Sequence, residues 1–413
     1  MKGNFIHKKN CRICQSSSLL KVLDLGRMPL ANLFLKKREL PKPELKFPLA
    51  AYFCQSCGLF QILDVVNPKI LFRHYYYLTS TSSPLADHFV ASGRELASRF
   101  IKSKKDLFVD IGGNDAVLLA SLKNKCRVLN VEPAQNIAKI SREKGVETME
   151  EFFGSSLAER IFRKYGSAKV VTASNVIAQM DDLKDSFMGV KKIIGQTGVF
   201  VLEVHWVANL LGLAGIGGFD QIYHEHLSYF SLTALKKLVE AVGLKIFDVK
   251  LIPIHGKSLR VYAAKSRKAA GSVKNFLQKE KDLGLDKAKT YIDFAERVEQ
   301  NKKELKDLLL KLKKENKKIV GYGAPAKGNI LLNYFGIDNK ILDFIIDDSP
   351  LKQGTYAPGS HIPVFSPARL RENRPDYLLV LAWNYAKSIF EKEKKLHDQG
   401  VKFIIPVPKV KIT

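Results

Sequence analysis

The sequence lacks any run of about 18 apolar residues, the length that a helix needs to cross a bilayer. Its N-terminus also lacks the basic stretch followed by an apolar stretch that is typical of a signal peptide. We therefore expect a cytoplasmic protein with no membrane partner. The 413 residues include 46% hydrophobic and 26% charged residues, which is ordinary for a globular protein, and the length suffices for two or three domains.

Acidic residues are scarce relative to basic ones, with 41 Asp and Glu against 67 Lys and Arg, so the formal net charge is +26. A charge of this sign is compatible with a nucleic-acid partner. However, the lysines lie along the whole chain and mix with acids at 302–304 and 313–315, and no Arg-rich segment interleaved with aromatics is present. A general positive field equally suits a small anionic substrate such as a nucleoside diphosphate. The pattern therefore argues against nucleic acid.

Cysteine is also scarce, and four of the five cysteines form two C-x-x-C pairs, Cys11 with Cys14 and Cys54 with Cys57. This spacing indicates a tetrahedral Zn²⁺ site. Four thiolates leave the metal no open coordination position, so the zinc is predicted to be structural. Redox-active pairs are the alternative. Cys126, just before an apolar run, is interpreted as a small buried hydrophobic residue.

Residues 1–80 form the predicted zinc-binding lobe. Four prolines divide it into short extended pieces and predict a small β-rich module: Pro29, Pro41, Pro43 and Pro48. Its end, residues 74–83, is aromatic and then rich in hydroxyl groups. This stretch is either a linker with packed tyrosines or a lid that brings Tyr76 over the pocket of the next domain.

A strand, a tight glycine turn and a helix are predicted at residues 107–122, as in nucleotide-binding βα units. The next apolar run ends in Glu132, whose carboxylate can accept hydrogen bonds from ribose hydroxyls. Asp110 precedes the glycines, where it would repel the pyrophosphate of NAD but attract the sulfonium and amino groups of S-adenosylmethionine. The residues predicted to contact this cofactor are Asp110, Gly112, Gly113, Asn114, Asp115, Glu132 and Asn175.

The alternation of strands and helices continues to residue 268 and predicts a doubly wound α/β sheet with an antiparallel final strand. The further strands are expected at 169–176, 199–204, 244–251 and 258–265. Ligands of such sheets bind at the carboxyl ends of the strands. One rim is therefore expected to carry Gly112, Glu132, Asn175 and His226.

Residues 269–413 are predicted to begin with a charged helical connector and to continue as a Rossmann-like domain. A second strand, glycine turn and helix lies at 319–329, and further strands are expected at 341–348 and 377–383. The backbone N–H groups of such a turn can hold a phosphate, and Lys327 would add positive charge. Simple packing of the turn glycines is the alternative.

The stretch 219–230 concentrates Tyr223, His224, Glu225 and His226 within a few residues. Histidine has the unperturbed pKa nearest to neutral pH, so such a cluster is a natural place for proton transfer. Two unrelated histidines near a helix start are the alternative.

Several stretches together resemble the sugar C-methyltransferases, the family of the TDP-sugar C3-methyltransferases that make branched deoxysugars. Besides the paired C-x-x-C motifs, they are D-I-G-G-N-D at 110–115, V-E-P-A-Q-N-I-A at 131–138, F-D-Q-I-Y-H-E-H-L-S-Y-F at 219–230, H-G-K-S-L-R at 255–260, G-Y-G-A-P-A-K-G-N at 321–329 and I-D-D-S-P-L-K-Q-G at 346–354. The resemblance runs nearly end to end, and the blocks at 219–230 and 321–329 are long and specific.

The resemblance implies three domains: a zinc lobe (1–80), a class I methyltransferase domain (81–268) and a connector with a Rossmann-like domain (269–413). It implies S-adenosylmethionine in the middle domain and a nucleotide-linked 4-keto-6-deoxy sugar, methylated at C3, in the cleft beside it. The family's general base falls on His226, with Tyr223 and Glu225 beside the sugar. We expect a monomer or weak oligomer. Further substrate contacts are expected from Tyr76, Gln179, His224, Lys257, Arg260, Tyr322 and Lys327.

Three positions depart from the family pattern. Gln179 stands where the family often has a histidine, and glutamine can hydrogen-bond but cannot carry a proton. Lys257 adds a cation to an H-G-G-S motif, and Ala116 replaces the third glycine of the cofactor turn.

Three alternative functions stay open: an O- or N-methyltransferase of a small polar substrate, a zinc-containing RNA-binding protein and an NAD-dependent oxidoreductase.

Overall fold

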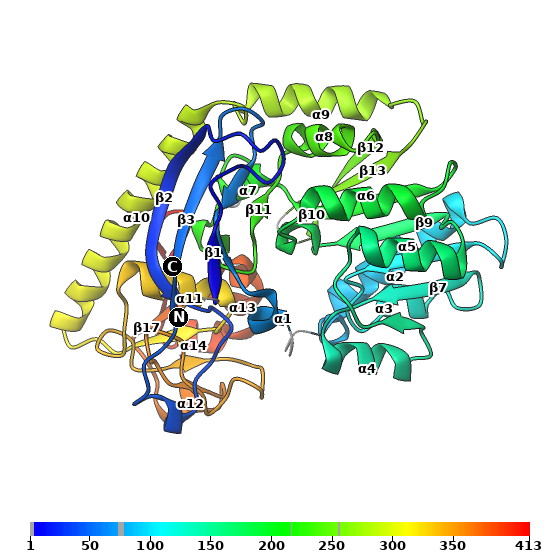
Figure 1. Cartoon of the computed structure of the whole chain (residues 1–413). Coiled ribbons are helices and arrows are strands. Elements are labelled where there is room, and N and C mark those ends of the chain that lie inside the picture. Colours follow the sequence, from blue (N-terminus) through cyan, green and yellow to red (C-terminus); the bar gives the residue numbers. More distant parts are fainter. Residues whose placement is uncertain (1–3, 73–77, 216, 255–256) are drawn as a thin grey trace.

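The structure is a computed structural model that describes residues 4–72, 78–215, 217–254 and 257–413. Three sheets dominate it, and Figure 1 shows them in two halves. The blue N-terminal strands lie together with the orange and red C-terminal part, and the cyan and green central sheet lies opposite. Among the described residues, no helix combines the length and the apolar character that crossing a membrane requires.

The N-terminal sheet has the strand order β11-β4-β3-β2, and its strand β11 comes from a distant part of the chain. Its strands are β2 (Leu19–Pro29), β3 (Lys46–Cys54), β4 (Phe60–Ile62) and β11 (Ser228–Tyr229). A separate antiparallel pair joins β1 (Phe5–His7) to β5 (Asp64–Val66), and α1 (Pro68–Phe72) follows. The lobe thus contains the predicted β structure and one strand borrowed from the stretch 219–230.

The prolines do not break this lobe into short pieces as predicted, since β2 and β3 span 11 and 9 residues. Pro29 ends β2, and Pro48 lies inside β3 opposite Arg27. Strand β4 pairs only with residues 51–53 of β3, so at Pro48 the second edge of the strand has no β4 partner. A proline is tolerated there because its missing N–H interrupts no second ladder.

The central sheet has the order β12-β13-β10-β9-β6-β7-β8. Strand β13 is antiparallel to both of its neighbours, while the pairs from β10 to β8 are parallel, so the predicted doubly wound sheet with an antiparallel final strand is confirmed. Its strands are β6 (Leu107–Ile111), β7 (Arg127–Val131), β8 (Thr148–Met149), β9 (Val170–Ser174), β10 (Val199–His205), β12 (Lys245–Ile252) and β13 (Ser258–Ala264).

Helices cover both faces of the central sheet because its strands are apolar on both sides. Helix α2 packs on α3 and helix α5 packs on α6, as Figure 1 also shows. The helices of this domain are α2 (Ser83–Phe100), α3 (Val117–Ala120), α4 (Gln135–Glu143), α5 (Ser155–Tyr165), α6 (Leu183–Ile193), α7 (Val207–Leu210) and α8 (Leu232–Ala241). The predicted N-cap of α8 is present, since the Ser231 side chain accepts a hydrogen bond from Ala234 N.

The predicted helical connector consists of two helices, α9 (Gly271–Asp282) and α10 (Ala288–Lys314). Helix α10 runs along β2 in Figure 1 and packs against it. Its fully buried Tyr291 stacks on Phe53 of β3, with ring centroids 4.2 Å apart. One face of α10 therefore covers the N-terminal sheet and its charged face is solvated, as predicted, whereas α9 packs on β12 and α8 of the central domain.

The C-terminal sheet has the order β16-β15-β14-β17-β18-β19 and is parallel except for the last pair, so the predicted Rossmann-like architecture is confirmed. Its strands are β14 (Ile319–Tyr322), β15 (Ile345–Ile346), β16 (Val364–Phe365), β17 (Tyr377–Val380), β18 (Lys402–Ile405) and β19 (Lys411–Ile412). Its helices are α11 (Ala326–Phe335), α12 (Arg369–Glu372), α13 (Ala386–Lys392) and α14 (Lys394–Asp398).

We expect Tyr291→Ala to destabilise the protein strongly, because it removes a buried ring that joins α10 to the N-terminal sheet. Losing a large aromatic side chain from a core costs about 3–5 kcal/mol. Urea unfolding followed by fluorescence measures the change. The adjacent Ile292 is 42% exposed, so Ile292→Ala is the matched control and should have little effect. Equal effects of the two substitutions would contradict the packing described above.

Candidate functional site

The glycine turn at the carboxyl end of β6 requires glycine at both positions. Gly112 has a φ of +66°, in the left-handed region. A Cβ on Gly113 would lie 2.4 Å from Asn130 Oδ1 and 2.8 Å from Asp110 Oδ2. The backbone N–H of Asn114 donates to Glu132 Oε2 at 3.1 Å, so the turn and the end of β7 are joined.

Two buried carboxylates flank this turn. Asp110 is 4% exposed and accepts a 2.7 Å hydrogen bond from Thr172 Oγ1, and burial raises the pKa of its carboxyl group to about 7. Burial also raises the pKa of Glu132 to about 7, although its second oxygen accepts from Ala134 N at 2.9 Å. A cation bound beside these groups would favour their ionised forms. The chemistry of this donor set therefore fits a positively charged nucleoside cofactor.

Two further polar groups face the same edge of the sheet. Asn175 follows β9 with a φ of +57°, and its amide oxygen is buried without a hydrogen-bond partner in the described structure, so it could accept a bond from a cofactor N–H. Asn114 Oδ1 accepts from the backbone N–H of Thr79 at 3.0 Å, which ties the hydroxyl-rich stretch to the cofactor turn. The predicted lid residue Tyr76 lies outside the described residues.

Asp115 is placed differently from its predicted cofactor role. Its side chain is fully buried, and Oδ2 forms a 2.7 Å ion pair with Lys144 Nζ. This ion pair ties the turn to the end of α4, so one oxygen of Asp115 has a structural role. The other turn residues keep their predicted place at the edge of the sheet.

Tyr223 and His226 form the centre of the candidate site. Tyr223 Oη and His226 Nε2 are 3.0 Å apart, and the two rings lie 4.2 Å apart between centroids. His226 is only 8% exposed, and its backbone N–H donates to Tyr223 O at 2.9 Å. A phenol and an imidazole at this distance can exchange or share a proton.

Sequence reasoning missed two neighbours of this pair. The ring of His205, the last residue of β10, lies 5.5 Å from the ring of His226 at an interplanar angle of 75°. Its position at the end of β10, the last parallel strand of this sheet along the chain, was the available signal. Asn32 donates a 2.7 Å hydrogen bond to Glu225 Oε1. These two residues are 193 positions apart, and no local pattern in the sequence joins them.

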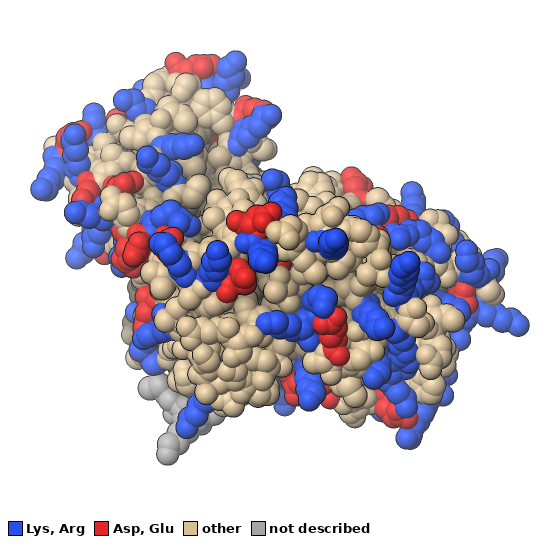
Figure 2. Space-filling view, turned by 90° about the horizontal axis from the view of Figure 1, so that it is seen from above, with Lys and Arg blue, Asp and Glu red and all other residues tan. Residues whose placement is uncertain are grey.

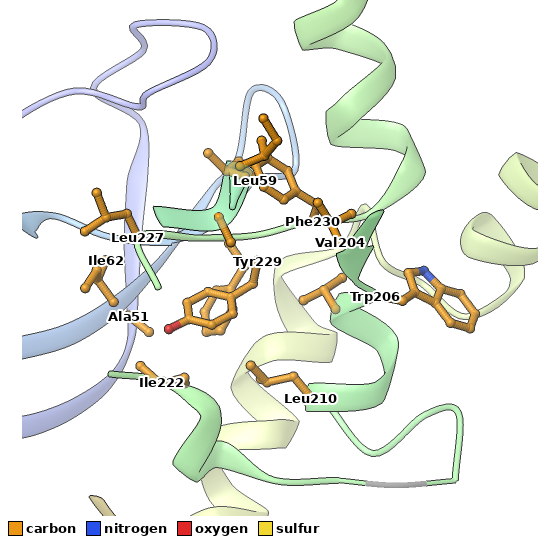
Figure 3. Close-up of a cluster of buried hydrophobic side chains, with 14 of the residues drawn as sticks. Ala51, Leu59, Ile62, Val204, Trp206, Leu210, Ile222, Leu227, Tyr229 and Phe230 are labelled. Carbon is orange, nitrogen blue, oxygen red and sulfur yellow. The ribbon is translucent and has the colours of Figure 1, made fainter. Parts of the chain in front are cut away.

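The segment after His226 connects two parts of the molecule. Leu227 O accepts from Ile62 N at 3.1 Å and Leu227 N donates to Ala178 O at 2.7 Å, after which β11 pairs with β4. Figure 3 shows Tyr229 at the centre of the resulting apolar cluster. On one side of it lie Leu227, Ile62 and Ala51, and on the other Phe230, Val204 and Trp206. The catalytic candidates are therefore held by the N-terminal sheet and the central domain together.

Gln179 lies close to this segment, since Ala178 is bonded to Leu227. Its amide Nε2 donates to Asn175 O at 3.4 Å, a weak bond that a ligand could replace. Lys257 is exposed and its Nζ donates to Ala214 O at 3.1 Å. The preceding residues His255 and Gly256 of the same motif lie outside the described residues.

Two predicted substrate-binding residues have structural partners instead. His224 is 1% exposed, packs edge-on against Phe47 and places Nε2 3.2 Å from Pro48 O, and burial lowers its pKa to about 4. Arg260 is 4% exposed and is held by Glu203 at 2.7 Å and Glu95 at 2.9 Å. Both predictions require correction, because these side chains satisfy other parts of the protein and do not line the site around His226.

The C-terminal domain meets the stretch 219–230 through Lys327. Its ammonium lies 4.4 Å from the ring centre of Trp383, whose Nε1 donates to Asp220 Oδ2 at 2.7 Å. Burial lowers the pKa of Lys327 to about 8 and raises that of Asp220 to about 6. Lys327 thus supplies a mostly buried cation at the start of α11.

Tyr322 lines a cavity of about 260 Å³ at the carboxyl ends of β14 and β15, although its hydroxyl donates to Glu393 Oε1 at 2.8 Å. Asp347, Asp348 and Lys392 provide charged groups of the same cavity. The position beside a glycine turn is where Rossmann-like domains bind nucleotides.

The four predicted zinc ligands lie together. The Sγ atoms of Cys11, Cys14, Cys54 and Cys57 are all within 4.8 Å of one another. Cys11 and Cys57 Sγ are 3.4 Å apart, and Cys14 and Cys54 Sγ are 3.5 Å apart. Around Zn²⁺ with Zn–S bonds of about 2.3 Å, tetrahedral sulfurs are about 3.8 Å apart. The donor set therefore fits a structural zinc ion.

The surface charge is not gathered into one patch on the face in Figure 2. Lysine and arginine residues are distributed over the whole face, and aspartate and glutamate residues lie among them.

Comparison with known families assigns nearly the whole chain. Residues 11–72 match "Putative zinc binding domain", residues 86–249 match "Methyltransferase domain" and residues 253–408 match "C-methyltransferase C-terminal domain". The chain is 34% identical to the C-methyltransferase NovU of Streptomyces niveus over 406 residues, which cover 97% of this chain and 96% of the relative.

Two solved methyltransferase structures resemble a part of the chain. Magnesium protoporphyrin IX methyltransferase of Synechocystis PCC 6803 with bound SAM matches with a TM-score of 0.33 and 10% identity, over 44% of this chain and 79% of the other. The CcbJ methyltransferase of Streptomyces caelestis matches with a TM-score of 0.34 and 12% identity, over 44% of this chain and 90% of the other.

Replacing Cys11 or Cys54 by serine should lower the zinc content and the melting temperature. A structural zinc site contributes folding free energy, and losing one thiolate weakens the whole site. Metal analysis of the purified protein with a thermal melt measures both quantities. Cys126→Ala is the control, because this buried thiol belongs to a different hydrophobic cluster and should leave the zinc content unchanged. Full zinc content in Cys11→Ser would rule out the four-thiolate site.

Binding of S-adenosylmethionine should release protons near neutral pH and become tighter as pH rises from about 6 to about 8. The reason is that Asp110 and Glu132, with pKa values near 7, are partly protonated in the free protein, whereas a bound cation favours their ionised forms. Calorimetric titration in two buffers of different ionisation enthalpy counts the released protons. Glu132→Gln should reduce that count, and an affinity independent of pH would contradict this role of the two acids.

Proposed function

The chain belongs to the C-methyltransferase family and is an S-adenosylmethionine-dependent methyltransferase, and from this premise we propose that its acceptor is a carbon next to the keto group of a nucleotide-linked deoxysugar. The observation that carries the proposal is the pair of Tyr223 Oη and His226 Nε2, 3.0 Å apart. Carbon methylation needs a base to remove a C–H proton and a donor to stabilise the enolate, and this pair can supply both.

The path of the chain supports a position of this pair near the cofactor turn. Leu227, next to His226, is bonded to Ala178 just after β9, and β9 is the direct neighbour of β6, which ends at the turn. His205 ends β10 on the other side of β9. The carboxyl ends of three adjacent parallel strands thus support a common site, as the topology of doubly wound sheets favours.

When bound, S-adenosylmethionine supplies an electrophilic methyl group on its sulfonium. Gly112 and Gly113 would let the backbone approach it, Glu132 would accept from the ribose hydroxyls, and the free amide oxygen of Asn175 would accept from the amino group. Asp110 would balance the positive charge through its buried carboxylate.

His226 is the proposed general base. Its imidazole would take the proton from the carbon beside the keto group, and the electron pair of that C–H bond would pass into the enolate. The enolate carbon would then bond to the methyl group as the bond between this methyl group and sulfur breaks, which leaves S-adenosylhomocysteine. Substrate binding would replace the Tyr223–His226 hydrogen bond, which frees the imidazole nitrogen for the proton and the phenol for the enolate oxygen.

The other predicted contacts would bind the substrate. Glu225, whose Oε1 accepts from Asn32, would accept a hydrogen bond from a sugar hydroxyl. Lys327 would bind the diphosphate of the substrate. It lies in the first turn of α11, where the backbone N–H groups of the helix also favour anions. A nucleoside in the cavity beside Tyr322 would then extend away from this diphosphate.

Gln179 favours a second candidate, methylation of an oxygen or nitrogen of a small polar substrate. Its amide can hydrogen-bond a hydroxyl or an amine, and such a transfer needs no removal of a carbon-bound proton. Exchange of the substrate C–H proton with D₂O in the absence of cofactor separates the two reactions. Exchange supports carbon chemistry, whereas an active enzyme without exchange would favour the second candidate.

His226→Ala should lower turnover by at least about 100-fold, since a positioned general base contributes about 10²–10⁴-fold to the rate. It should leave the affinity for S-adenosylmethionine unchanged and abolish the proton exchange in D₂O. Methyl transfer to a nucleotide-linked 4-keto-6-deoxy sugar, followed by mass spectrometry, measures the turnover. His397→Gln on α14 is the control variant and should behave as wild type. A nearly normal rate of His226→Ala would remove the general-base role.

A further inference from the structure

Arg12 stands between the first two zinc-ligating cysteines, yet its side chain is only 1% exposed. Burial of a guanidinium is costly unless hydrogen bonds and an opposite charge compensate it. Asp181 provides the charge, with Oδ1 3.2 Å from Arg12 Nε. A residue that needed only to link two cysteines would not require this degree of burial.

The remaining bonds of Arg12 go to two segments that adjoin the candidate site. Its Nη1 donates to Ile62 O, to Gln61 Oε1 at 3.2 Å and to Leu227 O at 3.4 Å. Its backbone N–H donates to Gln61 Oε1 at 3.2 Å as well. Main chain and side chain of Arg12 therefore both fix the end of β4, where β11 pairs.

These contacts reach residues directly beside the proposed chemistry. Leu227 follows His226, and Asp181 lies two positions after Gln179, whose helical turn ends at Met180. Leu227 O receives a backbone bond from Ile62 and a side-chain bond from Arg12, so its position depends on both. The Arg12 guanidinium therefore contacts both the segment that contains His226 and the loop that follows Gln179, and it fixes their positions relative to each other.

We propose that Arg12 is a positioning residue that connects the zinc knuckle to the methyl-transfer site, an inference that rests on the proposed role of His226. The planar guanidinium spans Asp181 on one edge and the carbonyls of Ile62 and Leu227 on the other. Zinc bound by Cys11 and Cys14 would hold the backbone on both sides of Arg12. It would thereby hold the Arg12 side chain in the position from which it makes these hydrogen bonds. The zinc site then acts on catalysis through the geometry of His226.

The effect should appear in turnover more than in binding. A reacting group displaced by about 1 Å loses on the order of 100-fold in rate, because proximity and alignment supply much of the catalysis. The cofactor turn has no contact with Arg12 among the hydrogen bonds of the described residues, so cofactor affinity should not depend on it.

The test compares Arg12→Lys with Lys8→Gln. Lysine keeps a positive charge but has a single side-chain nitrogen, so it cannot bond Asp181 with one nitrogen and the carbonyls of Ile62 and Leu227 with another, as Arg12 does. Lys8 Nζ lies 2.9 Å from Asp181 Oδ2, so Lys8→Gln removes a cation from the same carboxylate without touching Leu227. Zinc content, affinity for S-adenosylmethionine, kcat, KM and the histidine ring resonances of His226 are measured for both variants.

We expect Arg12→Lys to keep its zinc and its cofactor affinity, to lose on the order of 10- to 100-fold in kcat and to shift the His226 resonances. Lys8→Gln should match wild type in all of them. Unchanged kcat and unchanged His226 resonances in Arg12→Lys would overturn the proposal. A loss of zinc and cofactor binding together with activity would overturn it too, because Arg12 would then serve folding alone.

A second variant covers the case in which Arg12→Lys does not fold. Asp181 has a side chain that is 25% exposed, and Asp181→Asn removes the charge partner of Arg12 while leaving the zinc ligands intact. It should shift the His226 resonances in the same direction, and no shift would overturn the proposal. The resonances and the cofactor affinity are measured without a sugar substrate, so a wild-type protein that methylates no keto sugar would count against the proposed function alone.

Discussion

The segment from Leu227 to Phe230 is the constraint on which the rest of the structure depends, because two parts of the molecule share its backbone. Leu227 is bonded to the N-terminal sheet through Ile62 and to the central domain through Ala178. Phe230 O accepts from Val207 N at 2.9 Å, which attaches the other end of the segment to α7. Any shift of the N-terminal sheet relative to the cofactor turn would therefore move His226.

Burial shifts the pKa values of several charged groups in the regions that this segment connects. Asp110 and Glu132 stand beside the cofactor turn with pKa values moved up towards neutrality, and Lys327 and Asp220 are moved towards neutrality from opposite sides. Such groups respond strongly to a charged ligand because little free energy separates their protonation states. The proposed ligands carry charge in these two regions. The positively charged cofactor would lie beside Asp110 and Glu132 in the central domain, and the diphosphate would lie beside Lys327, where the C-terminal domain meets the central domain.

The sequence predicted the elements well where local chemistry decides them. The apolar runs identified β6, β7, β9 and β10 but missed the short parallel strand β8 and the C-terminal strands β16 and β18. The glycine turn and the four zinc thiols carried short-range signals that led to the correct fold. Neighbouring histidines could not be separated in the same way. His224 and His226 are two positions apart and are both buried, but His224 packs against Phe47 whereas His226 lies beside Tyr223.

Contacts between distant segments were beyond the reach of sequence patterns. Arg260 looks like a free cation in the sequence, but sheet register places it opposite Glu203, and their ion pair follows from that pairing. The bond of Asn32 to Glu225 depends on how the N-terminal lobe lies on the central domain. The prediction that the prolines break the lobe into short pieces failed for a related reason. Whether Pro48 interrupts β3 depends on which edge of the strand is hydrogen-bonded there, and β4 pairs only with residues 51–53 of β3.

The borrowed strand β11 also sets an order of events during synthesis. All four zinc thiols are present once residue 57 has been made, but the edge of β4 receives its partner only after residue 229 of 413. Until then the nascent chain carries an open strand edge, which is able to pair with the wrong strand. The N-terminal sheet is therefore complete only once the chain has been made as far as the middle of the central domain.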